Sequence, residues 1–439
     1  MRIRILKFAI LFSGVFGFSL AVAEPFTLKE AVLQVLARNP TVYSAVQEYK
    51  SRGFEVREAQ AGYLPSVDIG LGIGYEEVSN PATNNEDVDL TRKESSINVR
   101  QMLFDGFRTS NEVSRQEHRE QTAKFEAFSV AENQALRAAE VYIEVLKSKE
   151  FVAMAEQTLR VHDKIKKKMA ERMKSGVGNE SDYTQVSARV ALAEGNLEIA
   201  DSHYRDSITN YLRVVGSQPP IDEMVMPASL KGSFDLDIKQ ETQLALEQHP
   251  TLVAATSDVG AAQAQYSAAK SNMWPRVHLE ASKRFDDDIG GIEGNDEDLI
   301  VALRFRYDIY AGGGRSARKH YAAYQVEEAK GLRDNAHMQV IEAMRLSFNA
   351  YKSLNTKISY QKQHVDFALK TRNAYKEQFN IGKRTLLDVL NTENEYVDAQ
   401  RSYIRSSYDR QYSEYRIMNA KGQMISSLGL SMSDLLEMN

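Results

Sequence analysis

Residues that could carry out chemistry are few and widely spaced in this sequence. There is no cysteine, which excludes disulfides, zinc–thiolate sites and thiol nucleophiles. The eight histidines form no His-Glu-x-x-His pattern, the spacing that puts two zinc ligands on one helix face. Gly70-Leu71-Gly72-Ile73-Gly74 has the glycine spacing of a nucleotide loop, but a strand-like segment follows it instead of the helix that such a loop needs. The sequence therefore predicts no catalytic site and no nucleotide site.

Two acidic runs, residues 286–288 and 296–298, are the remaining candidates for ligand binding. Their carboxylates could hold Ca²⁺, but they lack the ordered ligand spacing of a calcium loop. We interpret both runs as solvated loops and expect neither a metal nor a cofactor.

The first 23 residues have the pattern of a cleaved export signal. A basic head with Arg2, Arg4 and Lys7 precedes an apolar run over 8–20, and Ala21-Val22-Ala23 is an A-x-A cleavage site. Removal of the three basic residues takes the formal net charge from −5 to −8. Nucleic acid is therefore not an expected partner, since phosphate binding needs a concentrated basic surface. No later run of 18 apolar residues predicts a membrane-spanning helix.

The chain contains a duplicated unit. Asn39-Pro40 is matched by His249-Pro250, and Leu64-Pro65 by Trp274-Pro275, both at an offset of 210 residues. Further along, Gly176 and Asp182 are matched by Gly382 and Asp388 at an offset of 206. This predicts two structural repeats, 24–215 and 239–420, with a connecting segment 216–238 and a C-terminal segment 421–439.

Each repeat is expected to be dominated by a very long helix. Residues 107–174 contain no proline or glycine and carry apolar residues at helical spacing, and 315–380 repeat the pattern. At 1.5 Å per residue each helix would be about 100 Å long. The helices should end at Gly176 and Gly382, and return helices should begin near Ser181 and Thr385, which are plausible N-caps. The full predicted helical hairpins are 107–215 and 314–420.

Each repeat should also begin with a helix broken at its proline, over 27–61 and 239–271, followed by two strands. The four strands are predicted at 64–75, 95–104, 275–285 and 299–310, with acidic loops at 76–94 and 286–298. Strands near ten residues with one apolar and one polar face are typical of membrane β-strands. The alternative is a half-buried soluble sheet, but the export signal and the paired occurrence favour the membrane.

Four strands cannot close a barrel, and an open edge in lipid leaves backbone groups unpaired. The chain should therefore share its sheet with copies of itself. Eight strands give a side-chain-filled barrel, whereas the small and polar residues on the inner face favour the twelve strands of a trimer. In strand 299–310, this arrangement puts Arg304, Arg306 and Asp308 in the lumen.

The segment 379–391 reads Phe-Asn-Ile-Gly-Lys-Arg-Thr-Leu-Leu-Asp-Val-Leu-Asn. This segment and its counterpart 175–182 resemble the tip hairpins of the TolC family of outer-membrane export ducts. The resemblance covers essentially the whole chain after the signal. It implies a mainly α fold with membrane β-structure: a trimeric twelve-stranded outer-membrane barrel continued by a long α-helical barrel in the periplasm. A belt around the middle would come from 216–237 and from the residues after 421.

The resemblance also implies roles for residues at the helical tip. Asp182 and Arg384 match positions that join neighbouring hairpins by charge-assisted hydrogen bonds, and Asp388 matches an acidic position lining the narrow entrance. Asn391 stands where the family can carry a second acid, and Phe379 where a tyrosine could donate a hydrogen bond. These departures put a second acidic ring in doubt and predict a weaker gate.

The implied function is that of a passive exit duct in a tripartite export system, with a periplasmic adaptor and an inner-membrane pump such as an ABC transporter as partners. Type I protein secretion and small-molecule efflux use the same kind of duct, so the sequence leaves the cargo open. A cell-envelope coiled-coil spacer is the alternative from another class. A cell-envelope hydrolase has no supporting residues.

Overall fold

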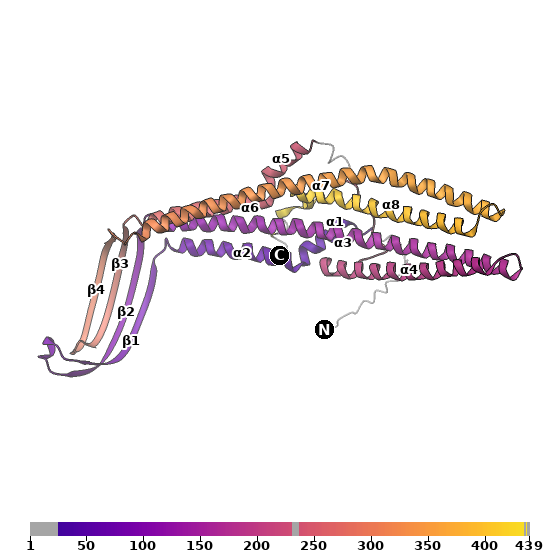
Figure 1. Ribbon diagram of the computed structural model, residues 1–439. Coiled ribbons are helices and arrows are strands. Elements are labelled where there is room, and N and C mark those ends of the chain that lie inside the picture. Colours follow the sequence, from indigo (N-terminus) through magenta and orange to yellow (C-terminus); the bar gives the residue numbers. More distant parts are fainter. Residues whose placement is uncertain (1–24, 231–236, 434–435, 437–439) are drawn as a thin grey trace, which may run out of the picture.

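The computed structural model describes residues 25–230, 237–433 and 436. The predicted export signal lies outside these residues, as do 231–236 of the connecting segment. The helices run side by side along one long axis, and a four-stranded sheet projects from one end (Figure 1). The turns of the two long hairpins lie at the other end, which is called the tip below.

The two repeats have the same order of elements. The first consists of α1 (Leu28–Arg38), α2 (Pro40–Ala61), β1 (Ser66–Val78), β2 (Val88–Phe104), α3 (Arg108–Lys174) and α4 (Glu180–Val215), with a short 3-10 helix η1 (Pro81–Thr83) between the strands. The second consists of α5 (Ile238–Gln248), α6 (Pro250–Ser271), β3 (Arg276–Ile289), β4 (Ile292–Arg306), α7 (Gly314–Asn380) and α8 (Leu386–Ala420), followed by α9 (Met424–Ser427). The long helices α3 and α7 have 67 residues each, which confirms the predicted rods.

The predicted proline breaks are present in both opening helices. Pro40 is the first residue of α2, where a missing N–H costs nothing, and the Asn39 side chain caps the helix by accepting from the Thr41 N–H. His249 caps α6 in the same way ahead of Pro250. Two helices laid end to end can therefore follow one long helix.

The four strands form one antiparallel sheet in the order β1-β2-β3-β4. They are longer than predicted, and the expected acidic loops at 76–94 and 286–298 are wrong. Most of those residues continue the ladder, because charged neighbours pair across it: Lys93 Nζ lies 2.9 Å from Asp287, and Lys283 Nζ lies 2.9 Å from Glu297. The short segment around η1 connects β1 to β2, and the Gly290-Gly291 turn connects β3 to β4.

Near the helices one face of the sheet is apolar and the other polar, whereas toward the hairpin turns the ion-paired lysines and acids just described share the otherwise apolar face. Val67, Val99, Ala281 and Val301 lie opposite one another across the four strands. Apolar side chains on this face are open in the single chain, with Leu71 82% exposed. A soluble sheet would cover such a face, so it needs lipid or a partner.

The main hydrophobic core lies midway along the helices, where the belt segments 216–230 and 421–433 wrap the bundle. Two buried carboxylates fix these segments. Glu132 on α3 accepts from the backbone N–H groups of Met424 (2.6 Å) and Ile425 (3.1 Å). Glu414 on α8 accepts from the Leu230 N–H at 2.9 Å.

Candidate gate at the helical tip

Two glycine turns form the tip. Gly176 (φ +76°) and Gly382 (φ +77°) both lie in the left-handed region, which an L side chain enters only with strain. In the first turn, the Val177 and Gly178 N–H groups return to the Arg172 carbonyl and satisfy the end of α3. The predicted helix ends are thus confirmed, and each turn reverses the chain within a few residues.

The return helices begin with side-chain caps at equivalent positions. Thr385 caps α8, as predicted, by accepting from the Asp388 N–H. The expectation that Ser181 caps α4 is wrong. Asn179 accepts from the Asp182 N–H at 2.8 Å, and the Ser181 hydroxyl only supports it by donating to the same oxygen. Asparagine is as good a cap as serine and stands at the one position with the required extended backbone.

Asp388 closes a capping box on α8. Its carboxylate accepts from the backbone N–H (3.1 Å) and the hydroxyl (2.9 Å) of Thr385. These bonds, and then the nearby charge of Arg384, lower the pKa of the exposed Asp388 carboxyl. Asp388 therefore stays ionised at any pH at which the protein would work.

Arg384 extends along its own hairpin. Its guanidinium lies 4.1 Å from the centre of the Tyr375 ring, and its Nε donates to Gln378 at 3.1 Å. Asp182 is half-buried, and its carboxylate has no partner within the described residues. A bond between Arg384 and an acid of another hairpin would therefore need a neighbouring chain.

Phe379 and Asn391 occupy different surroundings. Phe379 packs against a small core of Met169, Val186, Leu386 and Leu390, which joins the two hairpins of one chain. Asn391 is exposed on the first turns of α8 and has no side-chain partner among the described residues. The ring at position 379 thus holds the hairpins together through apolar contact.

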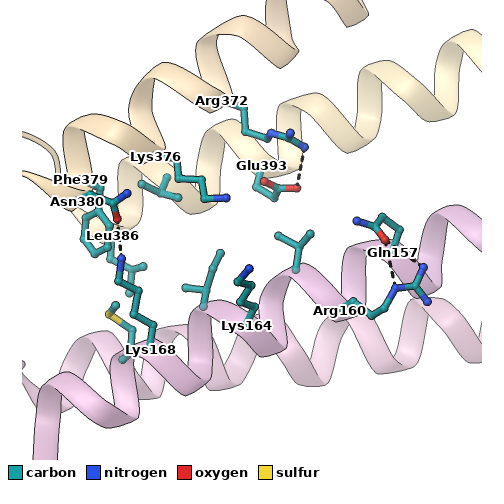
Figure 2. Close-up of a pocket in the computed structure, with 14 residues that line it drawn as sticks. Gln157, Arg160, Lys164, Lys168, Arg372, Lys376, Phe379, Asn380, Leu386 and Glu393 are labelled. Atoms are coloured by element: carbon teal, nitrogen blue, oxygen red, sulfur yellow. Dashed lines mark hydrogen bonds and ion pairs between the residues drawn. The ribbon is translucent and has the colours of Figure 1, made fainter.

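A cleft of about 520 Å³ opens between the two hairpins just above this small core (Figure 2). Figure 2 shows Lys164 and Lys168 of α3 pointing across it toward α7 and α8, and Lys168 Nζ donates to the Asn380 side chain at 2.6 Å. Arg372 approaches the buried Glu393 at 3.6 Å, and burial raises the pKa of Glu393 against the opposing charges of Arg372 and Lys376. The cleft is strongly basic.

Sequence reasoning missed this cleft. The only signal in the sequence is the density of lysines over 164–168 near the end of α3. The facing residues come from α7 and α8, some 200 residues away, and no pattern in the sequence links the two.

The predicted lumen residues lie on the sheet as follows. Arg304 and Arg306 are on the polar face of β4. Asp308 lies beyond the end of β4 and forms an ion pair with Arg315 at 3.3 Å, so its prediction as a strand residue is wrong. The strand ends early because the four residues after Arg306 have no partners on β3, which itself begins at Arg276.

Within the described part of the chain, no group of three or more histidine or acidic side chains could hold a metal ion. Over the same residues, no helix is both long enough and apolar enough to cross a bilayer.

The sequence matches the family described as outer membrane efflux protein twice, over residues 31–216 and 242–423. The chain belongs to this family. Each match falls on one of the two repeats, so the family signature and the duplication coincide. The outer membrane efflux protein BepC of Brucella suis is 26% identical over 409 residues, covering 93% of this chain and 88% of that protein. The outer membrane protein TolC of Escherichia coli is 21% identical over 450 residues, covering 96% and 86%.

Solved structures give the same fold. The Campylobacter jejuni CmeC outer membrane channel superposes with a TM-score of 0.81 at 14% identity, covering 93% of this chain and 88% of that one. The predicted family, fold class and outer-membrane location are confirmed. The protein is the outer-membrane duct of an export system, and the family and its structural neighbours are channel and transport proteins.

Proposed function

We propose that three copies of this chain form a passive exit duct with a gate at the helical tip. The observation that carries this proposal is the open sheet. β1 and β4 each pair on one side only, so two rows of backbone N–H and C=O groups have no partner in the described chain. In hydrocarbon each unpaired group costs several kcal/mol. Pairing β1 of one copy with β4 of the next removes both edges.

The two faces of the sheet support a barrel with an aqueous interior. The apolar face would contact lipid, and the face with Gly70, Gly72 and Gly74 would point inward. Two copies would give eight strands, whose interior is filled by side chains. Three copies give twelve strands, and the glycines on β1 leave space inside.

Native mass spectrometry of the protein in detergent tests the assembly. We expect three subunits, and the same stoichiometry after cross-linking in membranes. A stable monomer that inserts and conducts would refute the proposal.

The gate would be held by contacts between neighbouring hairpins. Arg384 and Asp182 lie at the turns of different hairpins, where Arg384 is exposed and Asp182 is half-buried. The Arg384 guanidinium lies against the Tyr375 ring and keeps N–H donors that no described residue accepts. The Asp182 carboxylate likewise has no partner among the described residues. Asp388 residues from three chains would form one ring of negative charge at the entrance, and Asn391 would add none.

Conductance in planar bilayers tests the gate. Arg384→Ser should raise single-channel conductance, while Lys383→Ser, one residue away on the same turn, should not. Asp388→Asn keeps an acceptor for the cap of α8 but removes the charge, so it should weaken block by multivalent cations added from the periplasmic side. Because the pKa of Asp388 is lowered, block of the parent should persist below the pH at which an ordinary aspartate is protonated. If both variants behave like the parent, the gate lies elsewhere.

A periplasmic adaptor and an inner-membrane pump would open the duct and supply the energy, and the duct itself would have no enzymatic activity. The names of its relatives cover both kinds of cargo: AprF of Pseudomonas aeruginosa is an alkaline protease secretion protein, and OpmQ of Pseudomonas putida is a pyoverdine export protein. Neighbouring genes for an ABC transporter, an adaptor and a large repetitive adhesin would indicate protein export.

A further inference from the structure

The polar face of the sheet is divided by charge. At the end next to the helices it carries four arginines, Arg100, Arg276, Arg304 and Arg306, with Glu280 as the one carboxylate among them. Toward the hairpin turns acids prevail. Those on the same face are Glu76, Glu94, Asp286, Asp296 and Asp298, against Arg92 and Arg284, while Asp68 lies between the two regions, one row from Arg100. The four arginines are called the arginine band below.

Glu280 orients two members of the band and leaves their outer atoms free. Arg100 donates to it through Nε at 3.0 Å, and Arg304 donates to its other oxygen, also through Nε. Both arginine side chains remain more than 60% exposed. The terminal Nη groups of both have no partner within the described residues, so they point their donors into open space.

The other two arginines lie opposite each other, and neither pairs with a carboxylate in the described chain. Arg276 and Arg306 lie directly opposite each other in the β3–β4 register, an arrangement that destabilises a sheet when the charges are alike. Arg276 donates to the neutral Asn272 side chain at 3.1 Å, and Arg306 has no partner in the described chain. An anion between them would relieve the repulsion, and guanidinium forks bind carboxylate and phosphate groups well.

We propose that the arginine band is a transient binding site for anionic groups, carboxylates or phosphates, on cargo passing from the helical tube into the sheet region. The proposal rests on the trimeric duct, in which the bands of three chains would form one ring. Rings of arginine or lysine are how pores select anions. The entrance ring of Asp388 has the opposite charge, so the two rings would act on different groups of a cargo.

Single channels in planar bilayers at low salt test the proposal, with tripolyphosphate as the anion. We expect tripolyphosphate to block the parent. Arg306→Gln should weaken the block by about tenfold, the loss expected from one charge-assisted hydrogen bond. This variant breaks no contact in the chain, so it should fold and conduct. The double variant Arg304→Gln/Arg306→Gln should weaken the block further.

Arg284→Gln is the matched control, because Arg284 lies on the same face nearer the hairpin turn and faces Asp286 at 3.8 Å. It should leave the block unchanged. Equal weakening by Arg284→Gln, or an unchanged block in Arg306→Gln, would overturn the band while leaving the duct intact. A parent that forms no channels would overturn the duct and the band with it.

Discussion

Removing the hydroxyl of Tyr142 should loosen the belt, because this one atom connects three backbone groups. Tyr142 lies on α3 and is 0% exposed. Its hydroxyl lies 2.7 Å from the Phe26 carbonyl and 2.8 Å from the Val225 carbonyl, either of which can accept its proton, and it accepts from the Val225 N–H at 3.1 Å. Phe26 also pairs with Met224, so the residues just before α1 and the connecting segment are both fixed to the long helix here.

Tyr142→Phe keeps the ring and removes these bonds. The Val225 N–H and the Phe26 carbonyl still bond each other at 3.3 Å, so the part-buried Val225 carbonyl is the group left without a partner. A lost hydrogen bond is worth about 1 kcal/mol, and leaving this carbonyl unsatisfied raises the cost to about 2 kcal/mol. The free energy of unfolding should fall by that amount, and the thermal midpoint by a few degrees. Circular dichroism of the purified protein in detergent measures both.

Tyr211 provides the control. It is equally buried, but its hydroxyl has no hydrogen-bond partner within the described residues. Burial, and then the nearby Tyr142, raise the pKa of Tyr211, and its unpartnered hydroxyl is a cost to the fold. Tyr211→Phe should be neutral or slightly stabilising. If the two variants lose the same stability, the loss comes from ring packing and the hydrogen-bond argument is wrong.

Three further predictions concern a carboxylate, a turn and the sheet register. Burial raises the pKa of Glu132 to about 7 from 4.5, so the folded chain binds a proton that the unfolded chain lacks between these pH values. Its contribution to stability should rise by about 3 kcal/mol as the pH falls from 7 to 4.5 and stay level above 7, and Glu132→Gln should flatten this part of a pH series of thermal melts. Gly382→Ala should lower the free energy of unfolding by about 1 kcal/mol because of the left-handed backbone alone, since open space surrounds the added carbon. Gly195→Ala inside α4 should leave stability unchanged or raise it, as measured by the same thermal melts. A cysteine at Arg304 should react with a soluble maleimide in intact membranes and one at Leu303 should not; the reverse would shift the register by one residue.

The helices were predictable from the sequence because their signals are local. Apolar residues at helical spacing in a long run without proline, with a glycine just after its end, placed α3 and α7 within a residue or two. The strands were predicted too short for an equally local reason. Charged residues on both faces at 91–94 and 286–288 resemble a loop, and only the pairing of Lys93 with Asp287 shows that the ladder continues.

What the sequence could not supply are contacts between distant segments. Glu132 and Glu414 are acids on helices that are largely polar, and nothing near them in the sequence marks them as buried. Their partners are backbone N–H groups nearly 300 and nearly 200 residues away. The basic cleft is similar, since its lysines come from one repeat and Arg372 and Glu393 from the other. At the tip, the residue types were predicted, but the capping role of Asp388 became clear only from the geometry of α8.

The two repeats are alike in sequence order but not in surroundings, and the difference bears on how copies assemble. α3 lies inside the helical layer and packs against α2, α4, α6 and α8, whereas the principal contacts of α7 are with α5, α6 and α8. α7 consequently exposes large apolar side chains along its free flank, among them Tyr324, Met338 and Phe367. At the opposite flank, α2 and α4 expose Phe54 and Ile199. Because these two flanks are different surfaces, a contact between them is head-to-tail, and a head-to-tail contact that closes gives a ring instead of a two-fold dimer. β1 and β4 are the edge strands of the sheet at the other end of the molecule, and pairing β1 of one copy with β4 of the next is also a head-to-tail contact. The helices and the strands therefore both favour one cyclic assembly.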